Sequence, residues 1–213
     1  MVEAHLTGAF PRSERLIEAT RASERGKISN TELEAIREND AQALIELQHD
    51  VSLDAIVDGQ LNWQDLFRPF SELFTGIELA GLTRWFDNNT FYRKPVITGK
   101  VARGTGSLDR FFQHKMFPHQ DRKKVILPGP FSFGVLAENH AYANLADLID
   151  ALAHSLKQTV AELQRAGYSI FQFNEPALTG AKAGNLEVAR SAIFPNNWVR
   201  GLSPVLNVRV PQA

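Results

Sequence analysis

Four short apolar runs divide the chain, and each is followed by small or polar residues. Continuous apolar runs of this length are typical of strands in parallel sheets, because helices cover both faces of such a sheet. The hydrophobic pattern therefore predicts four parallel strands in sequential order, at residues 4–8, 53–58, 124–128 and 169–173.

Amphipathic patterns with helical spacing lie between these runs. Ser29 and Glu32 have the spacing of a capping box, and apolar positions follow roughly one helical face over residues 33–51. A clearer helix is expected to begin at Asn144 and to stop at Gly167. Strands that alternate with helices form right-handed βαβ units. We therefore expect an α/β fold, namely a parallel (β/α) barrel of TIM type that is incomplete and contains about the first four βα units.

One excursion interrupts this alternation. Residues 61–124 are rich in aromatic side chains, and connections of this length are uncommon in compact domains unless they are functional. The excursion begins at the carboxyl end of a predicted strand, where barrels build their active sites. Within it we expect a helix near 63–74 and a hairpin that turns at 87–89. The chain, 1–213, is interpreted as one partial barrel domain that ends in an irregular tail over 194–213.

The composition restricts the classes of partner. The chain has 213 residues and a formal net charge of −1, so no field of one sign attracts nucleic acid or an anionic membrane. It has no apolar run near the ~20 residues of a membrane span, and its first residues lack a signal-peptide pattern. We expect a cytoplasmic protein with neither nucleic-acid nor membrane partners. Cysteine is absent, which excludes disulfides, thiol nucleophiles and cysteine-ligated zinc within this chain.

Small and polar residues at the four strand ends are the best candidates for a ligand site. Glycines there let the backbone approach a ligand, and carboxylates and amides can orient its polar groups. The alternative is that such residues merely end strands, but four sets in register favour function. The sets are Thr7-Gly8-Ala9, Asp58-Gly59-Gln60, Gly129-Pro130 and Asn174-Glu175-Pro176.

Other polar motifs give weaker evidence for a functional site. His114 and His119 with Asp121 match no metal-ligand spacing and are interpreted as a solvated loop. The Gly-x-Gly at 104–106 lacks the third glycine of a nucleotide-binding loop. The basic run at 122–124 is interpreted as a solvated edge before a strand. We assign no metal ligand and no catalytic residue from these motifs.

Five motifs in a fixed order resemble a known family. They are Gly8-Ala-Phe-Pro-Arg12, Leu53-Asp-Ala-Ile-Val-Asp-Gly-Gln60, Phe91-Tyr-Arg-Lys-Pro95, Leu127-Pro-Gly-Pro130 and Asn174-Glu-Pro-Ala-Leu178. From about residue 5 to about residue 180 the chain resembles the catalytic domain of cobalamin-independent methionine synthase, especially the short single-barrel forms.

This resemblance implies methyl transfer to the sulfur of homocysteine on a (β/α) barrel. In that family a zinc ion activates the thiol as a thiolate, and the methyl donor is 5-methyltetrahydrofolate or a methylated corrinoid protein. The resemblance puts the Gly8 turn against the carboxylate of homocysteine and Gln60 and Asn174 near its amino group. It puts Arg93 and Lys94 on the methyl-donor side. The substrate-binding set that it implies is Thr7, Gly8, Ala9, Asp58, Gln60, Asn174 and Glu175.

Two departures from the family bear on function. The family usually has serine at the position of Ala9, and the long enzymes have carboxylates at those of Gln60 and Asn174. The family's zinc ligands, His-x-Cys, Glu and a further Cys, lie in the second half of its barrel, and a chain without cysteine cannot supply them. We expect this chain to be the first half of a methyltransferase that needs a second half for zinc.

Two alternative functions remain open. One is a truncated, non-catalytic barrel that binds a ligand, and the other is a zinc-independent barrel of the corrinoid or decarboxylase kind. In any of these cases four parallel strands leave two open sheet edges, which are templates for another chain. We therefore expect pairing with a complementary half, or a homodimer, rather than a stable monomer.

Overall fold

The computed structural model describes residues 3–85, 89–180, 187–188 and 205–207. Its helices are α1 (Glu14–Glu24), α2 (Asn30–Asp50), α3 (Arg68–Leu73), α4 (Pro130–Leu136) and α5 (Leu145–Arg165). Its strands are β1 (Phe74–Arg84), β2 (Phe91–Arg103), β3 (Lys123–Pro128), β4 (Glu138–Asn139), β5 (Tyr168–Asn174) and β6 (Val205–Asn207). Short 3-10 turns occur at Leu108–Arg110, His114–Met116 and Pro176–Gly180. Over these ranges, no helix combines the length and the apolar character needed to cross a membrane.

Parallel segments lie side by side in the order of the sequence. β3 pairs with β5, and β5 pairs with β6, in both cases in parallel. Isolated parallel bridges join His5 to Ala55 and Ile56 to Lys123. The α/β class, the parallel direction and the predicted order are confirmed. The last two predicted strands correspond to β3 and β5, whereas the first two are reduced to isolated bridges, one in the first segment and two in the second.

Side chains explain why the first two segments are bridges and not longer strands. The Lys124 ammonium donates to the carbonyl oxygen of Leu6 at 2.8 Å. In the second segment the Gln48 amide of α2 bonds both backbone groups of Val57, at 2.9 and 3.0 Å. These side chains satisfy backbone groups that a neighbouring strand would otherwise have bonded.

β6 is a strand that the hydrophobic pattern did not predict. Its three residues pair with the carboxyl-terminal half of β5. At 205–207 the structure thus differs from the irregular tail expected over 194–213, because three residues suffice to extend a sheet whose edge is already formed. The rest of that predicted tail lies outside the described residues.

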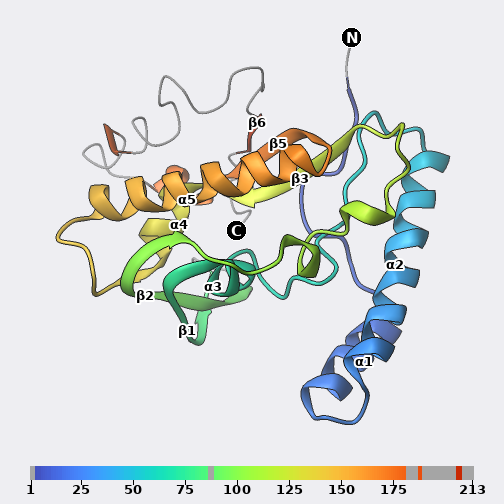
Figure 1. The fold of residues 1–213 in the computed structure, drawn as a ribbon, viewed down its shortest axis with the longest axis horizontal. Helices are drawn as coiled ribbons and strands as arrows, with labels where there is room; N and C mark the ends of the chain where they lie inside the picture. The colour runs from blue at the N-terminus through green and yellow to red at the C-terminus, as the bar shows by residue number, and fades with distance from the viewer. Residues whose placement is uncertain (1–2, 86–88, 181–186, 189–204, 208–213) are drawn as a thin grey trace.

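α1 and α2 form a helical arm at one end of the molecule (Figure 1). The capping box at Ser29 and Glu32 is confirmed and begins α2. Asp40, which interrupts the apolar pattern of α2, accepts hydrogen bonds from the backbone N–H and the hydroxyl of Ser13 at 3.0 and 2.9 Å. Ser13 is the N-cap of α1, a helix that the pattern did not predict. Asp40 therefore joins the start of α1 to the middle of α2.

α5 lies across the sheet of β3 and β5 (Figure 1). Its predicted start is confirmed, because the Asn144 side chain accepts from the backbone N–H of Asp147 at 2.9 Å. Gly167 follows its end with φ of 94°, a conformation that favours glycine. The apolar stripe of α5 is buried in the main core, together with residues of β3, β5 and the excursion.

The predicted excursion contains α3 and an antiparallel hairpin of β1 and β2, as expected. The helix is shorter than 63–74, because the Asp65 carboxylate bonds the backbone N–H groups of Phe67 and Arg68 and α3 begins only there. Part of the predicted turn at 87–89, namely 87–88, lies outside the described residues. The Phe67 ring packs against Phe133 of α4, with centroids 4.9 Å apart. The excursion is therefore a packed layer of the core.

Candidate active site

The carboxyl ends of the parallel segments are tied to one another by hydrogen bonds. The backbone N–H of Gly129, after β3, donates to the Asn174 carbonyl at the end of β5 at 2.8 Å. The Gln60 side-chain amide donates to the Ile126 carbonyl of β3 at 3.1 Å. Three of the four predicted strand ends therefore lie at one edge of the sheet.

The turn at Asp58–Gln60 is tightly organised. Gly59 and Gln60 have φ of 67° and 53°, in the left-handed region. The buried Asp58 carboxylate holds this shape by accepting from the backbone N–H groups of Gln60 at 2.9 Å and Gln113 at 3.3 Å. The Gly59 carbonyl in turn accepts from the Phe10 N–H at 2.9 Å. This bond brings the fourth strand end, the Gly8 loop, to the same edge.

Gln172 of β5 connects the first and last of these ends. Its side-chain nitrogen donates to the Thr7 carbonyl and to the Asn174 side-chain oxygen, at 2.8 Å in each case. Gln172 is fully buried, and its side-chain oxygen has no partner among the described residues. Gln172 was not among the site residues predicted from the sequence, although an amide inside an otherwise apolar strand is a usable signal.

The Gly8 turn is open. Nothing lies within 4 Å of the position that a Cβ atom at Gly8 would occupy. Thr7 and Ala9 on either side are exposed. Backbone groups here are accessible to a ligand, in contrast to the buried turn at Asp58–Gln60.

Glu175 is fully buried and uses both carboxylate oxygens on α4. They accept from the backbone N–H groups of Phe131 at 3.0 Å and Ser132 at 2.6 Å. Burial raises the pKa of Glu175 to about 7, and these hydrogen bonds oppose the rise. Gly129 is required beside it, because a Cβ atom there would lie 2.0 Å from the carboxyl carbon. The Glu175 side chain therefore positions α4, and its oxygens face that helix.

The basic run at 122–124 is not a solvated edge throughout, which corrects the sequence interpretation. Lys123 and Lys124 are buried, with Lys124 only 1% exposed. Burial lowers the pKa of Lys124 to about 8. The misinterpretation has a physical cause: the acceptor of the Lys124 ammonium is the carbonyl of Leu6, 118 residues away.

Arg93 and Lys94 lie on β2, in the hairpin of the excursion. The backbone N–H of Arg93 donates to Asp65 at 3.2 Å, which ties the hairpin to the chain that follows Gln60. The Lys94 ammonium donates to Glu138 of β4 at 3.1 Å. These contacts do not bring either side chain to the strand ends.

The described residues do not fit a zinc ion. They contain no group of three or more histidine, aspartate, glutamate or cysteine side chains that could hold a metal ion, and the chain has no cysteine at all. Asp121, one of the weak candidates, lies 3.1 Å from the His49 ring nitrogen. His119 is exposed, and the side chain of His114 lies outside what the structure describes.

Parallel strands in sequential order, with ligand-type residues at their carboxyl ends, define an α/β protein of the kind that builds its site on the loops of that edge. The sequence model of a protein family, described as the catalytic domain of cobalamin-independent synthase, matches residues 3–198. The chain belongs to that family.

Curated relatives of this chain are named methionine synthases. A methionine synthase of Saccharolobus solfataricus is 28% identical over 204 residues, which cover 95% of this chain and 60% of the relative. One of Sulfurisphaera tokodaii is 29% identical over 198 residues, covering 92% of this chain and 57% of the relative. This chain thus spans a little over half the length of these curated relatives.

Solved structures show the shared fold. A putative vitamin-B12 independent methionine synthase from Listeria monocytogenes superposes with a TM-score of 0.74 at 18% identity, over 97% of this chain and 65% of that one. A B12-independent methionine synthase from a Shewanella species, solved with selenomethionine, gives 0.64 at 20% identity, over 85% and 54%.

Proposed function

We propose that this chain supplies the first half of a methyl-transfer site for homocysteine, within a barrel that a second half completes. The observation that supports this most is the linkage of the Gly8 turn, Gln60 and Asn174 at one sheet edge. Family membership supports the reaction type. In the reaction the homocysteine thiol releases its proton to solvent and its sulfur forms a bond to the methyl carbon. The bond from that carbon to its carrier breaks, and the carrier keeps the electron pair.

The proposed roles follow from the exposure of the Gly8 turn and from the hydrogen-bond chemistry of the side chains beside it. The open backbone around Gly8, between Thr7 and Ala9, suits the carboxylate of homocysteine. The side-chain oxygens of Gln60 and Asn174 suit its ammonium group, because amide oxygens accept hydrogen bonds. Gln172 orients Asn174 through the bond between their side chains.

The remaining proposed residues act at a distance from the substrate. Asp58 fixes the turn that carries Gln60, and Glu175 fixes α4 against Asn174. They are positioning residues. We propose Arg93 and Lys94 for the methyl-donor side, supported by the tie between their hairpin and the segment that follows Gln60. The donor class, 5-methyltetrahydrofolate or a methylcorrinoid, is an outcome of the test below.

The ligands for zinc have to come from outside the described residues. Two partners are proposed: a separate second half that carries the zinc ligands, or a second copy of this chain, which closes the sheet but supplies no cysteine ligand. The alternative function is a non-catalytic barrel that binds an amino acid ligand. It is favoured by the absence of a three-ligand group among the described residues.

The test is a methionine-forming assay with homocysteine, zinc and each donor in turn. The chain is assayed alone and with the corresponding second half of the Saccharolobus solfataricus relative. Methionine is expected only with both halves. Asn174→Ala should lower kcat/KM at least tenfold, about 1.4 kcal/mol, mainly through KM. Gln158→Ala, an exposed change on α5, is the matched control.

Three other outcomes are informative. If a complex of both halves forms without producing methionine, the enzyme proposal fails. Calorimetric binding of homocysteine to the chain, lost in Asn174→Ala, would then support the binding alternative. Methyl transfer with bound corrinoid and no zinc would instead support the zinc-independent barrel.

A further inference from the structure

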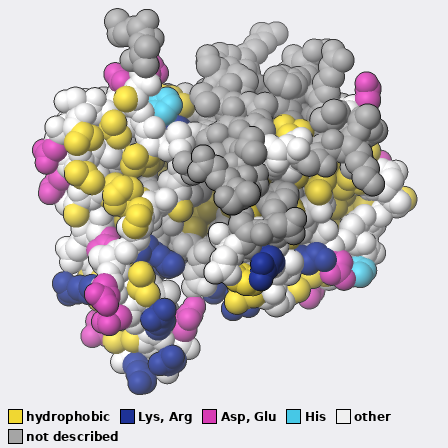
Figure 2. Space-filling view, turned by 180° about the vertical axis from the view of Figure 1, so that it is seen from behind, with side chains coloured by type: hydrophobic (Ala, Val, Ile, Leu, Met, Phe, Trp, Pro, Cys, Tyr) yellow, Lys and Arg dark blue, Asp and Glu magenta, His cyan; other side chains and the backbone are white. Residues whose placement is uncertain are grey.

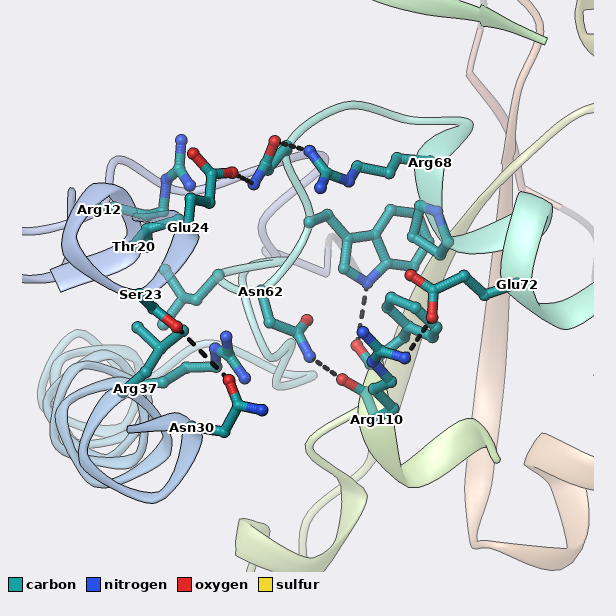
Figure 3. A pocket seen from close by; sticks show the side chains of 16 residues that line it. Arg12, Thr20, Ser23, Glu24, Asn30, Arg37, Asn62, Arg68, Glu72 and Arg110 are labelled. Atoms are coloured by element: carbon teal, nitrogen blue, oxygen red, sulfur yellow. Dashed lines mark hydrogen bonds and ion pairs between the residues drawn. The ribbon is translucent and has the colours of Figure 1, made fainter. Parts of the chain in front are cut away.

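A pocket of about 300 Å³ lies between the α1–α2 arm and the chain that follows Gln60. Four arginines line it, each from a different part of the sequence. Figure 3 shows Arg12 and Arg37 on one side of the pocket, Arg68 and Arg110 on the other, and Asn62 between them. Figure 2, seen from behind, shows charged side chains gathered at the end of the molecule that carries α1.

Two carboxylates also line the pocket, and both are engaged. Glu72 forms an ion pair with Arg110. Glu24 accepts a hydrogen bond from Gln64 at 2.8 Å, and Gln64 in turn accepts from Arg68. Four cationic and two anionic side chains therefore face the same space, which leaves an excess of positive charge.

Arg37 and Arg12 retain unused donors. The Arg37 side chain is only 15% exposed and pairs with Glu34 through one terminal nitrogen. A guanidinium has five N–H donors, so most of those of Arg37 remain available. Arg12 has no hydrogen-bond or ion-pair partner in the described part of the chain.

Two buried polar atoms in this pocket have no partner among the described residues. They are the Nε of Arg37 and the side-chain oxygen of Asn62. The Asn62 amide nitrogen is already used on the Arg110 carbonyl, which fixes the side chain. One is a donor and the other an acceptor; buried polar atoms without a partner are rare in folded proteins and point to a missing ligand or water.

The cations also oppose one another. Burial lowers the pKa of Arg37, and the nearby Arg110 and Arg12 lower it further against the effect of Glu34. A bound anion would relieve both the repulsion and the unused donors. Planar guanidinium groups match oxygen pairs of carboxylates and phosphates.

We propose that this pocket binds a phosphate group whose oxygens accept hydrogen bonds from Arg12 and Arg37. Arg68 faces the phosphate from a third side. Donors that arrive from three separate elements require an anion with acceptors in three directions, which a tetrahedral phosphate has and a planar carboxylate lacks. A hydroxyl of the ligand or of water donates to the side-chain oxygen of Asn62. The volume leaves room for an organic substituent on the phosphate. This site is independent of the proposed methyl transfer.

The experiment is calorimetric titration of the full chain with inorganic phosphate and with glycerol phosphate, each at constant ionic strength in chloride. Saturable binding to one site per chain is expected. Arg12→Gln should weaken it at least tenfold, and Arg15→Gln, an exposed change on α1, should leave it unchanged. Tighter binding of glycerol phosphate would assign the pocket to organic phosphates, and equal binding would assign it to the free ion.

Arg37→Gln should also weaken binding, but it leaves Glu34 unpaired, so its melting temperature has to be measured as well. Arg12→Gln carries the test if Arg37→Gln does not fold. Binding that is unchanged in Arg12→Gln, or that Arg15→Gln weakens equally, would overturn the proposal. So would heats that chloride reproduces at the same ionic strength.

Discussion

The buried carboxyl of Glu175 makes stability depend on pH in an unusual direction. Burial raises its pKa to about 7 in the folded chain, whereas the ordinary value is 4.5. The folded state therefore holds a proton that the unfolded state has lost between these two values. Since stability falls with pH wherever the folded state binds more protons, the chain should be more stable at pH 5 than at pH 8.

The magnitude follows from the same two values. A difference of about 2.5 pKa units corresponds to roughly 3 kcal/mol when the whole titration is included. Between pH 5 and pH 8 the expected loss is about 2 to 3 kcal/mol of unfolding free energy, because part of the titration lies below pH 5. Glu175 is fully buried, so solvent does not screen this effect.

The assay is urea denaturation at several pH values and one protein concentration, for the wild type and Glu175→Gln. The amide keeps the shape of the side chain and one acceptor but cannot ionise. The variant should lose stability at low pH and show a slope from pH 5 to 8 that is flatter by the amount above. Histidines contribute equally to both proteins, so the difference isolates Glu175. Identical slopes would show that Glu175 does not have a raised pKa in the folded chain.

Three further predictions concern packing, capping and metal. Gly129→Ala places a Cβ atom 2.0 Å from the Glu175 carboxyl carbon and should lower the unfolding free energy, measured in urea, by about 2 kcal/mol or more. The control Gly81→Ala, whose Cβ atom would have nothing within 4 Å, should change that free energy by less than about 1 kcal/mol. Ser29→Ala removes the capping box with Glu32 and should lower the unfolding free energy by about 1 kcal/mol, and an unchanged value would contradict the capping role. Purified chain dialysed against a mild chelator should retain far less than one zinc by elemental analysis; a stoichiometric content would show that our ligand assignment is wrong.

Local signals were sufficient for much of the fold. The capping box and the N-cap at Asn144 were predicted from neighbouring residues, and both are present. β3 and β5 were predicted because apolar runs of that length have few other interpretations. α1 was missed because only Leu16 and Ala19 of its residues are buried, which leaves almost no apolar stripe to detect.

The candidate site was predictable in position but not in orientation. The strand-end rule selected Asn174 and Glu175 together, yet the Glu175 oxygens bond α4, more than 40 residues earlier in the sequence. The bonds of Gln172 to Thr7 and of Lys124 to Leu6 span more than 100 residues. Such partners depend on the packed structure, and no local pattern encodes them.

Because of these long-range hydrogen bonds, the two edges of the sheet differ in how readily they can pair with another chain. Val125, Leu127, Phe171 and Phe173 pack in the main core, so the alternate residues Lys124 and Gln172 lie on the other face of the sheet. Their side chains donate to the carbonyl oxygens of Leu6 and Thr7, so two backbone acceptors of the amino-terminal edge are already hydrogen-bonded. A partner that pairs with this edge must share those acceptors or displace two hydrogen bonds, at about 1 kcal/mol each. In the proposed two-part barrel, the edge at the amino-terminal segment is therefore the weaker template for association, and the first contact with a second half is expected at the opposite edge, where β6 lies.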